Sequence, residues 1–303
     1  MSKIEWTEKT WNPVTGCTRI SPGCQHCYAE RMAKRLQAMG QTQYQGTIDK
    51  NGRWSSQINF VESALGIPLK RKKPTMWFVN SMSDLFHADV KFDWLDAIWQ
   101  VMFRTPQHTY QILTKRAHLL PDRVQAMVDA YGVLPNVWIG TSVESQQYAN
   151  ERIPYLIRTP AAVRFLSCEP LVGPVSFDLI DGMIYDGGMP VEWQRIATPP
   201  IHWVIVGGES GPGARPMHPD WARQIRDQCT SAGISFFFKQ WGAWCQGCGP
   251  GPEGVHMSAD GQVVRNFAKE HRTGVSHVNL SRVGKKSAGR LLDGREWNEM
   301  PGD

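Results

Sequence analysis

The sequence predicts an α/β protein built on a full or partial parallel (β/α) barrel with a C-terminal appendage. Short apolar runs, rich in β-branched and aromatic residues, recur through the middle of the chain, as buried parallel strands do. Segments with apolar residues three and four apart lie between most of these runs and predict helices. Alternating units of this kind form a barrel or a doubly wound sheet, and their number here suits the barrel.

The predicted strands are six short apolar runs, with a further strand near residues 10–14. The six runs cover residues 76–79, 110–113, 137–139, 163–166, 203–206 and 234–238. The expected helices cover residues 92–103, 119–131, 146–157 and 221–232. Asp93, Ser145 and Asp220 stand where N-caps are expected, because their side chains can accept a hydrogen bond from a free N–H of the first turn.

Two regions interrupt this pattern and are interpreted as insertions near residues 40–74 and 174–200. The first ends in the basic run Lys70-Arg71-Lys72-Lys73, and the second contains several glycines and prolines. Beyond residue 242 the chain becomes rich in glycine and proline and then basic. We therefore predict a barrel over residues 1–242 and an appendage over residues 243–303 that packs on it.

Composition restricts the possible classes of protein. No stretch approaches the roughly 18 apolar residues that span a bilayer, and the N-terminus lacks the apolar run of a secretory signal. We therefore expect a cytoplasmic protein with no membrane partner. The net charge of +5 permits an anionic partner but is far from that of a dedicated nucleic-acid-binding domain. Seven cysteines in so large a chain indicate metal binding or redox chemistry rather than disulfide stapling.

Cys17, Cys24 and Cys27 form the strongest chemical motif. They lie on a loop that contains glycine and proline and leads into a helix expected at about residues 24–39. Three thiolates spaced in this way can bind three corners of a [4Fe–4S] cubane and leave one iron open. The N-terminus of the helix would face the anionic cluster. A structural zinc site that also uses His26 is the main alternative, and three metal-free cysteines are another.

Polar residues follow each predicted strand, and in a parallel barrel these strand ends meet at the mouth where catalytic groups lie. Cys168 and Glu169 are catalytic candidates, with Cys168 as a thiol hydrogen donor or nucleophile; a buried packing cysteine is the alternative. Lys115, Arg116 and Lys239 can hold a phosphate or carboxylate, or else pair with nearby glutamates.

Several motifs resemble the phage-encoded three-cysteine-motif family of radical-SAM-like proteins, where SAM is S-adenosylmethionine. The resemblance covers nearly the whole chain and is carried by residues 11–17, by the cysteine loop through residues 27–30, and by residues 80–86, 206–211, 238–242 and 288–295. It implies a barrel of the radical SAM type, a [4Fe–4S] cluster on the three cysteines, SAM as cofactor and a reductant protein as partner. The implied activity is generation of a 5′-deoxyadenosyl radical, and the resemblance does not supply a substrate.

The cysteine spacing departs from the commonest radical SAM signature. Six residues separate Cys17 from Cys24, where that signature has three. His26 precedes the last cysteine, where an aromatic residue usually lies near the SAM adenine; Tyr28 follows it. If SAM binds, the resemblance makes Tyr28 and the polar strand ends its candidate contacts: Ser81, Ser83, Asp84, Ser142, Glu144, Gly207, Gly208 and Glu209.

Substrate and accessory chemistry are less constrained. The basic run and the basic C-terminus favour a nucleic acid or nucleotide as substrate. Cys245 and Cys248 form a second CxxC that suits an auxiliary cluster, a zinc site, a redox pair or a structural role. The alternative function is a non-catalytic iron–sulfur or zinc protein that binds nucleic acid or a protein partner.

Overall fold

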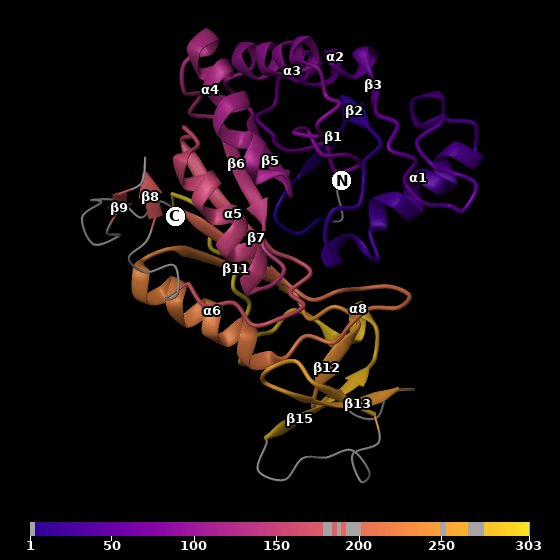
Figure 1. Ribbon diagram of the computed structural model, residues 1–303, viewed down its shortest axis with the longest axis vertical. Coiled ribbons are helices and arrows are strands. Elements are labelled where there is room, and N and C mark those ends of the chain that lie inside the picture. The colour runs from indigo at the N-terminus through magenta and orange to yellow at the C-terminus, as the bar shows by residue number, and fades with distance from the viewer. Residues whose placement is uncertain are drawn as a thin grey trace. The chain divides into compact units, whose positions relative to one another are not determined.

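The computed structural model describes residues 4–177, 184–186, 189–191, 201–248, 253–265 and 276–302, and it divides into two compact units (Figure 1). The first unit comprises Met1–Ser142 and Arg152–Phe165, and the second Val143–Glu151 and Leu166–Asp303. The division falls inside helix α5 (Gln146–Arg158) and strand β7 (Val163–Cys168). The predicted boundary at residue 242 stays a prediction.

The main sheet has seven strands in the order β1-β4-β5-β6-β7-β10-β11. Every pair in it whose register is described is parallel. Helices α3, α4, α5 and α6 each connect two successive strands, which is the pattern of a partial (β/α) barrel, so the predicted fold class is confirmed. The other strands are β1 (Lys9–Trp11), β4 (Met76–Val79), β5 (Thr109–Thr114), β6 (Val137–Ser142), β10 (Trp203–Gly207) and β11 (Ser235–Gln240).

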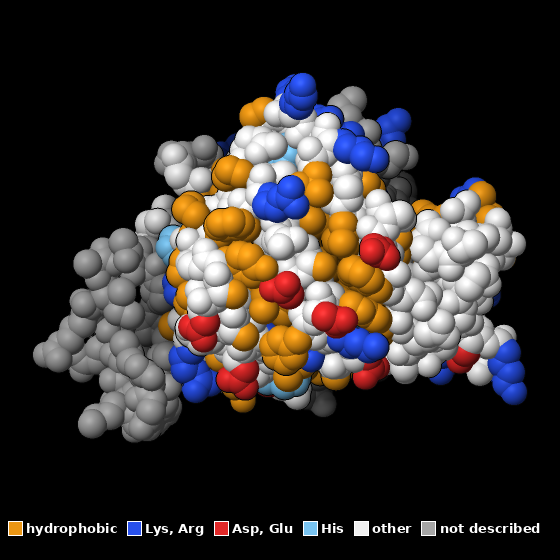
Figure 2. Space-filling view, turned by 90° about the horizontal axis from the view of Figure 1, so that it is seen from above, with side chains coloured by type: hydrophobic (Ala, Val, Ile, Leu, Met, Phe, Trp, Pro, Cys, Tyr) orange, Lys and Arg blue, Asp and Glu red, His pale blue; other side chains and the backbone are white. Residues whose placement is uncertain are grey.

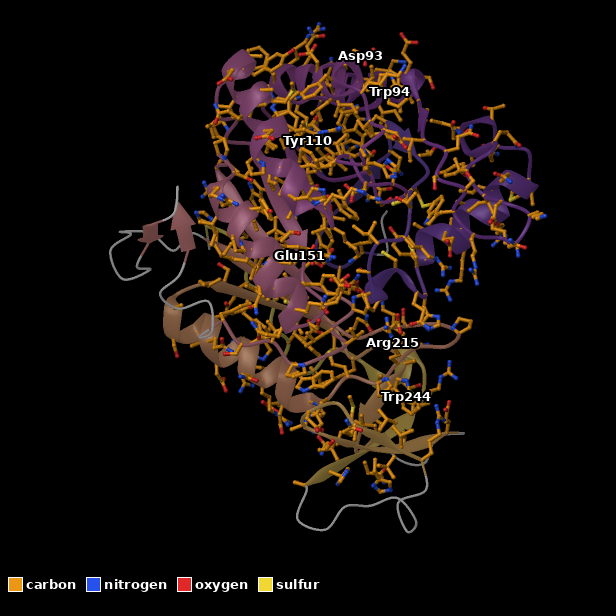
Figure 3. The ribbon with its side chains drawn as sticks, viewed as in Figure 1. Asp93, Trp94, Tyr110, Glu151, Arg215 and Trp244 are labelled. Atoms are coloured by element: carbon orange, nitrogen blue, oxygen red, sulfur yellow. A yellow bond between two sulfur atoms is a disulfide. The ribbon has the colours of Figure 1, made fainter. Side chains whose placement is uncertain are left out.

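In the first unit, helices α3 (Phe92–Arg104) and α4 (Leu120–Tyr131) agree with the predicted segments. The predicted N-cap of α3 is wrong: Lys91 is the last extended residue and occupies the N-cap position without a side-chain hydrogen bond, whereas Asp93 lies in the first turn beside Trp94 (Figure 3). The apolar stripe of α3 is buried, with Leu95, Ile98 and Met102 all 0% exposed. The same core contains Tyr110 of β5, whose hydroxyl is 2.6 Å from Thr105 Oγ1.

The predicted insertion near residues 40–74 folds onto the N-terminal segment. Its strand β3 (Asn59–Phe60) pairs antiparallel with β2 (Val14–Thr15), and it also contains the short helix α2 (Gly66–Lys70). Tyr44 and Ile48 pack with Ala29 and Ala33 of helix α1 (Tyr28–Ala38) in one buried cluster. The start expected for this helix near residue 24 is wrong, because Pro22–Cys24 forms a separate 3-10 turn.

In the second unit, α6 (Pro219–Ala232) packs on β10 and β11 (Figure 1). Its N-cap is His218 rather than the predicted Asp220, because His218 is the last extended residue and its ring accepts the Asp220 N–H. A second sheet has the order β12-β15-β13-β14, formed by Trp244–Gln246, His277–Arg282, Gly254–Ser258 and Val263–Val264. The second unit also contains the antiparallel pair β8 (Ile184–Asp186) and β9 (Met189–Val191) and helix α8 (Lys285–Ala288).

Much of the predicted insertion at residues 174–200 lies outside the described residues. Within the residues that the structure describes, no helix is long and apolar enough to cross a membrane. Figure 2 shows a face on which hydrophobic side chains are interspersed with basic and acidic ones.

Candidate functional site

The three cysteines of the loop are free thiols, each half-buried, in the first unit. Two consecutive turns keep the loop compact: the Cys24 N–H donates to the Ser21 carbonyl at 2.9 Å and the Cys27 N–H to the Cys24 carbonyl at 3.3 Å. The loop lies beside the end of β4, because Gly16 and Ser83 form a parallel bridge. The end of a sheet strand therefore borders the first cysteine.

Cys27 is the N-cap of α1; its side chain makes no capping hydrogen bond, but its sulfur lies near the N–H groups of Ala29 and Glu30, which favour its charged form. The helix N-terminus carries partial positive charge, which favours a thiolate or an anionic ligand at this position. Burial nevertheless raises the pKa of Cys27, because the apolar surroundings disfavour the charged form more than the neighbouring N–H groups favour it. Without a cation the thiol therefore stays protonated at neutral pH.

Cys17 has the more strongly shifted thiol. Burial, with the nearby Asp84 carboxylate, raises the pKa of Cys17 to about 12, although the Arg116 guanidinium acts in the opposite direction. The protonated thiol donates to the Thr18 carbonyl at 3.5 Å. Metal binding at Cys17 must therefore displace a proton, as it does generally at thiolate sites.

Arg116 and Asp84 form a buried ion pair next to Cys17. Their side chains are 6% and 7% exposed, and Arg116 Nη1 lies 2.9 Å from Asp84 Oδ2. The same carboxylate accepts from Thr114 Oγ1 at 2.7 Å, from the Phe86 N–H at 3.0 Å and from the Lys115 N–H at 3.2 Å. Asp84, a predicted SAM contact, thus links the ends of β4 and β5, and Arg116 pairs with this aspartate rather than with a glutamate.

Thr18 and His87 extend this network. The His87 ring accepts the Asp89 N–H at Nδ1, so its proton lies on Nε2, which donates to Thr18 Oγ1 at 2.8 Å. Burial, helped by the Arg116 charge, lowers the pKa of His87, so the ring is neutral at pH 7. Sequence reasoning missed His87 because nothing in its local pattern relates it to a loop 69 residues away.

The other predicted SAM contacts of the first unit lie at strand ends. The Tyr28 hydroxyl donates to the Ser81 carbonyl at 2.8 Å, and its side chain is 50% exposed. Ser81 Oγ donates to Asn12 Oδ1, and Ser83 Oγ donates to the Val14 carbonyl. Ser142 is buried at the end of β6. The structure therefore brings Tyr28 and Ser81 together beside the loop, with Ser83 adjacent.

The residues of the loop fit a three-cysteine cluster in their chemistry. Three thiolate donors are the ligand type that such clusters take, and the charges on Cys17, Cys24 and Cys27 are close enough to influence one another. Two arginines act on them: Arg116 contacts Cys17, and the Arg19 charge interacts with the other two, although each arginine is paired with a carboxylate, Asp84 and Glu30. Among the described residues, no three His, Cys, Asp or Glu side chains are gathered closely enough to hold a metal ion as they stand.

In the second unit, Glu169 and Lys239 form an ion pair at the ends of β7 and β11. Lys239 Nζ lies 2.7 and 3.0 Å from the two Glu169 carboxylate oxygens, and both side chains are mostly buried. Gly207 leaves room for this carboxylate, since an added Cβ would lie 3.4 Å from it. Of the two expectations for Lys239, pairing with a glutamate is the one found.

Cys168 is fully buried, and its charge interactions are with Cys229 and Glu144. Burial raises the pKa of the Cys168 thiol, so the thiol form is retained and the position has the character of a packing cysteine. Glu144 is itself 0% exposed, and its carbonyl accepts the Val172 N–H. Its burial places this predicted SAM contact inside the second unit rather than on its surface.

Glu209 is bound by Arg215 rather than left open to a ligand. Its carboxylate receives the Arg215 Nε and Nη2 at 2.9 and 2.8 Å, together with the Arg215 backbone N–H. An added Cβ on Gly208 would lie 2.1 Å from the Trp241 carbonyl oxygen, so the space expected for a cofactor at Gly208 contains the chain itself.

Near Arg215, the second unit has a pocket of about 460 Å³ (Figure 3 labels Arg215 and Trp244). Its charged lining consists of Arg215, Arg265, Arg282 and Glu253. Glu253 binds both Arg265 and Arg282.

The second CxxC forms a disulfide between Cys245 and Cys248. Cys245 is buried on β12, whereas Cys248 is exposed. A disulfide is compatible with the redox and structural alternatives considered for this motif.

Comparison with known proteins gives a family and a set of distant structures. A family profile described as "Protein of unknown function (DUF5131)" matches residues 1–301. A search of curated proteins found no match.

The similar solved structures are spore photoproduct lyases. A cysteine-to-serine mutant is 13% identical, with a TM-score of 0.42 over 91% of this chain and 69% of that one. A complex with dinucleoside spore photoproduct is 12% identical (TM-score 0.39, covering 73% of this chain and 60% of that one). A tyrosine-to-phenylalanine mutant is 15% identical (TM-score 0.34, 52% and 44%). The chain thus spans less than two thirds of the length of the latter two proteins.

Proposed function

This chain belongs to the DUF5131 family of proteins of unknown function, and we propose that it is an iron–sulfur protein acting as a radical SAM enzyme. The observation that carries the proposal is the free-thiol loop of Cys17, Cys24 and Cys27, bordered by Arg116 and the N-terminus of α1 on a parallel β/α scaffold. The motifs that resemble the phage-encoded three-cysteine-motif family support the same assignment.

In this proposal a [4Fe–4S] cluster, when bound, would supply the one electron that cleaves the S–C5′ bond of SAM to give methionine and a 5′-deoxyadenosyl radical. The residues of the chain would hold the cluster and adjust the charge around it. Cys17, Cys24 and Cys27 would hold the cluster, and the positive end of α1, at the Ala29 and Glu30 N–H groups, would favour negative charge at Cys27. Tyr28 and Ser81, which are hydrogen-bonded to each other, would contact SAM in this proposal. A reductant protein in the cytoplasm would supply the electron.

The test is an EPR spectrum of anaerobically reconstituted, reduced protein with and without SAM. A [4Fe–4S]⁺ signal that changes on adding SAM is the expected result, because SAM would bind the open iron directly. Cys24→Ala should lose iron, whereas Cys248→Ser, outside the loop, should retain it. A signal indifferent to SAM, or stoichiometric zinc in place of iron, would leave a non-catalytic metal protein that binds a nucleic acid or protein partner.

For the substrate we propose a nucleic acid or nucleotide. The pocket of the second unit supports an anionic ligand, since three arginines line it with one glutamate, and the basic run at residues 70–73 and the net charge of +5 agree.

The substrate proposal is tested by fluorescence anisotropy with a labelled single-stranded oligonucleotide. Arg265→Glu should weaken binding about tenfold at low salt, because it reverses an exposed charge at the pocket. Arg158→Glu makes the same charge change on an exposed residue of α5 and is the matched control. Equal effects of the two variants, or no binding by the unmodified chain, would remove the substrate proposal and leave the cluster proposal standing.

A further inference from the structure

Arg116 connects three segments of the first unit at the Cys17 end of the loop. Its Nη1 donates to Asp84 at 2.9 Å and lies 3.9 Å from the Cys17 sulfur. Its Nη2 donates to the Thr18 carbonyl at 3.2 Å and also to Thr18 Oγ1. One planar guanidinium therefore fixes the residue after the first cysteine while facing the sulfur itself.

Asp84 holds Arg116 in this position. The carboxylate accepts hydrogen bonds from Thr114, Phe86 and Lys115 in addition to Arg116, so it is fixed from the ends of both β4 and β5. Because both charged side chains are almost fully buried, water screens their fields weakly. An electron added next to Cys17 would experience both fixed charges, and the two act with opposite sign.

We propose that Arg116, fixed by Asp84, is a positioning residue for Cys17 and that this ion pair sets the reduction potential of the cluster. The inference rests on the proposed function, since it concerns a cluster bound at Cys17. The step is the addition of one electron from a reductant to the oxidised cluster. Positive charge beside a metal site favours the reduced, more negative state, and negative charge disfavours it.

The experiment is a potentiometric titration of reconstituted protein, followed by EPR, for four variants. Arg116→Met leaves the Asp84 charge unopposed, so the ratio of reduced to oxidised cluster at a fixed potential should fall about tenfold, a shift of about 59 mV to more negative potential for one electron. Asp84→Asn should shift the potential in the opposite direction. The double variant Arg116→Met/Asp84→Asn removes both charges and should return close to the unmodified value. Arg31→Met, an exposed arginine of α1, is the control and should not shift.

A purely structural role for the pair predicts a different pattern. Both single variants would then lose iron, and the double variant would be no better than either. That pattern, or single variants with unchanged potentials, overturns the inference. If Arg116→Met does not fold, the sign of the shift in Asp84→Asn decides the outcome by itself. If the unmodified protein binds no iron, the proposed function and this inference both fail. If it binds iron but the variants have the same reduction potential as the unmodified protein, the inference alone fails.

Discussion

At the scale of single residues, two adjacent glycines at the end of β10 differ in what they permit. Gly208 approaches the backbone of Trp241 so closely that an added Cβ would lie 2.1 Å from its carbonyl oxygen. An added Cβ on Gly207 would make only an ordinary contact, 3.4 Å from Glu169. Gly208 is therefore required by the chain's own packing, and Gly207 is not.

We expect Gly208→Ala to lower the free energy of unfolding by about 1–3 kcal/mol, because the backbone at Trp241 must move to admit a methyl group. Gly207→Ala should cost less than about 1 kcal/mol. Urea denaturation of the two variants measures the difference. Equal stabilities would show that this close approach is absent in solution.

At the scale of elements, α6 begins with a histidine cap. His218 Nδ1 accepts the Asp220 N–H at 3.2 Å, and its side chain is almost fully buried. Burial lowers the pKa of His218; the charge of Arg223 acts in the same direction and that of Asp220 opposes it. The pKa of His218 is thus lower in the folded protein than in the unfolded one. Between these two pKa values the unfolded state binds more protons. Stability from this group is complete above about pH 6.5 and is lost as the pH falls below it.

His218→Asn should reduce the loss of thermal stability between pH 7 and pH 5, because asparagine also caps helices but does not titrate. The readout is the change of melting temperature with pH, since the smaller asparagine side chain also lowers the melting temperature at neutral pH. Thermal unfolding followed by circular dichroism across this range measures it. A slope equal to that of the unmodified protein would contradict the assignment.

At the scale of the whole molecule, the end of the chain covers the last strand of the main sheet. The Phe238 N–H donates to the Trp297 carbonyl at 3.0 Å, and the Phe236 N–H donates to the Glu299 carboxylate at 2.8 Å. Trp203 Nε1 donates to the Glu299 carbonyl, and the Trp297 ring packs against Phe236. An exposed edge strand can pair with a strand of another molecule, and these contacts protect β11 from such pairing.

Deletion of residues 297–303 should therefore lower the melting temperature and promote aggregation, because it removes these hydrogen bonds and exposes β11. Deletion of residues 301–303 alone should change neither property, since the contacts to β11 come from residues 297–300. Differential scanning calorimetry with light scattering compares the two truncations. Similar behaviour of both would show that the segment does not protect the edge.

Apolar periodicity and cysteine spacing are local properties of the chain, so they predicted the strands of the main sheet, helices α3 to α6 and the cysteine loop. They did not predict the second sheet or the start of α1. They also did not predict that α3 begins after Lys91 and α6 after His218, since the exact end of a helix differs by one or two residues from what a local pattern indicates. The pairing of Arg116 with Asp84 and the approach of Trp241 to Gly208 became visible in the folded chain alone. Such pairings depend on how distant strand ends meet, and a buried charge or backbone group takes the partner that this meeting brings within reach.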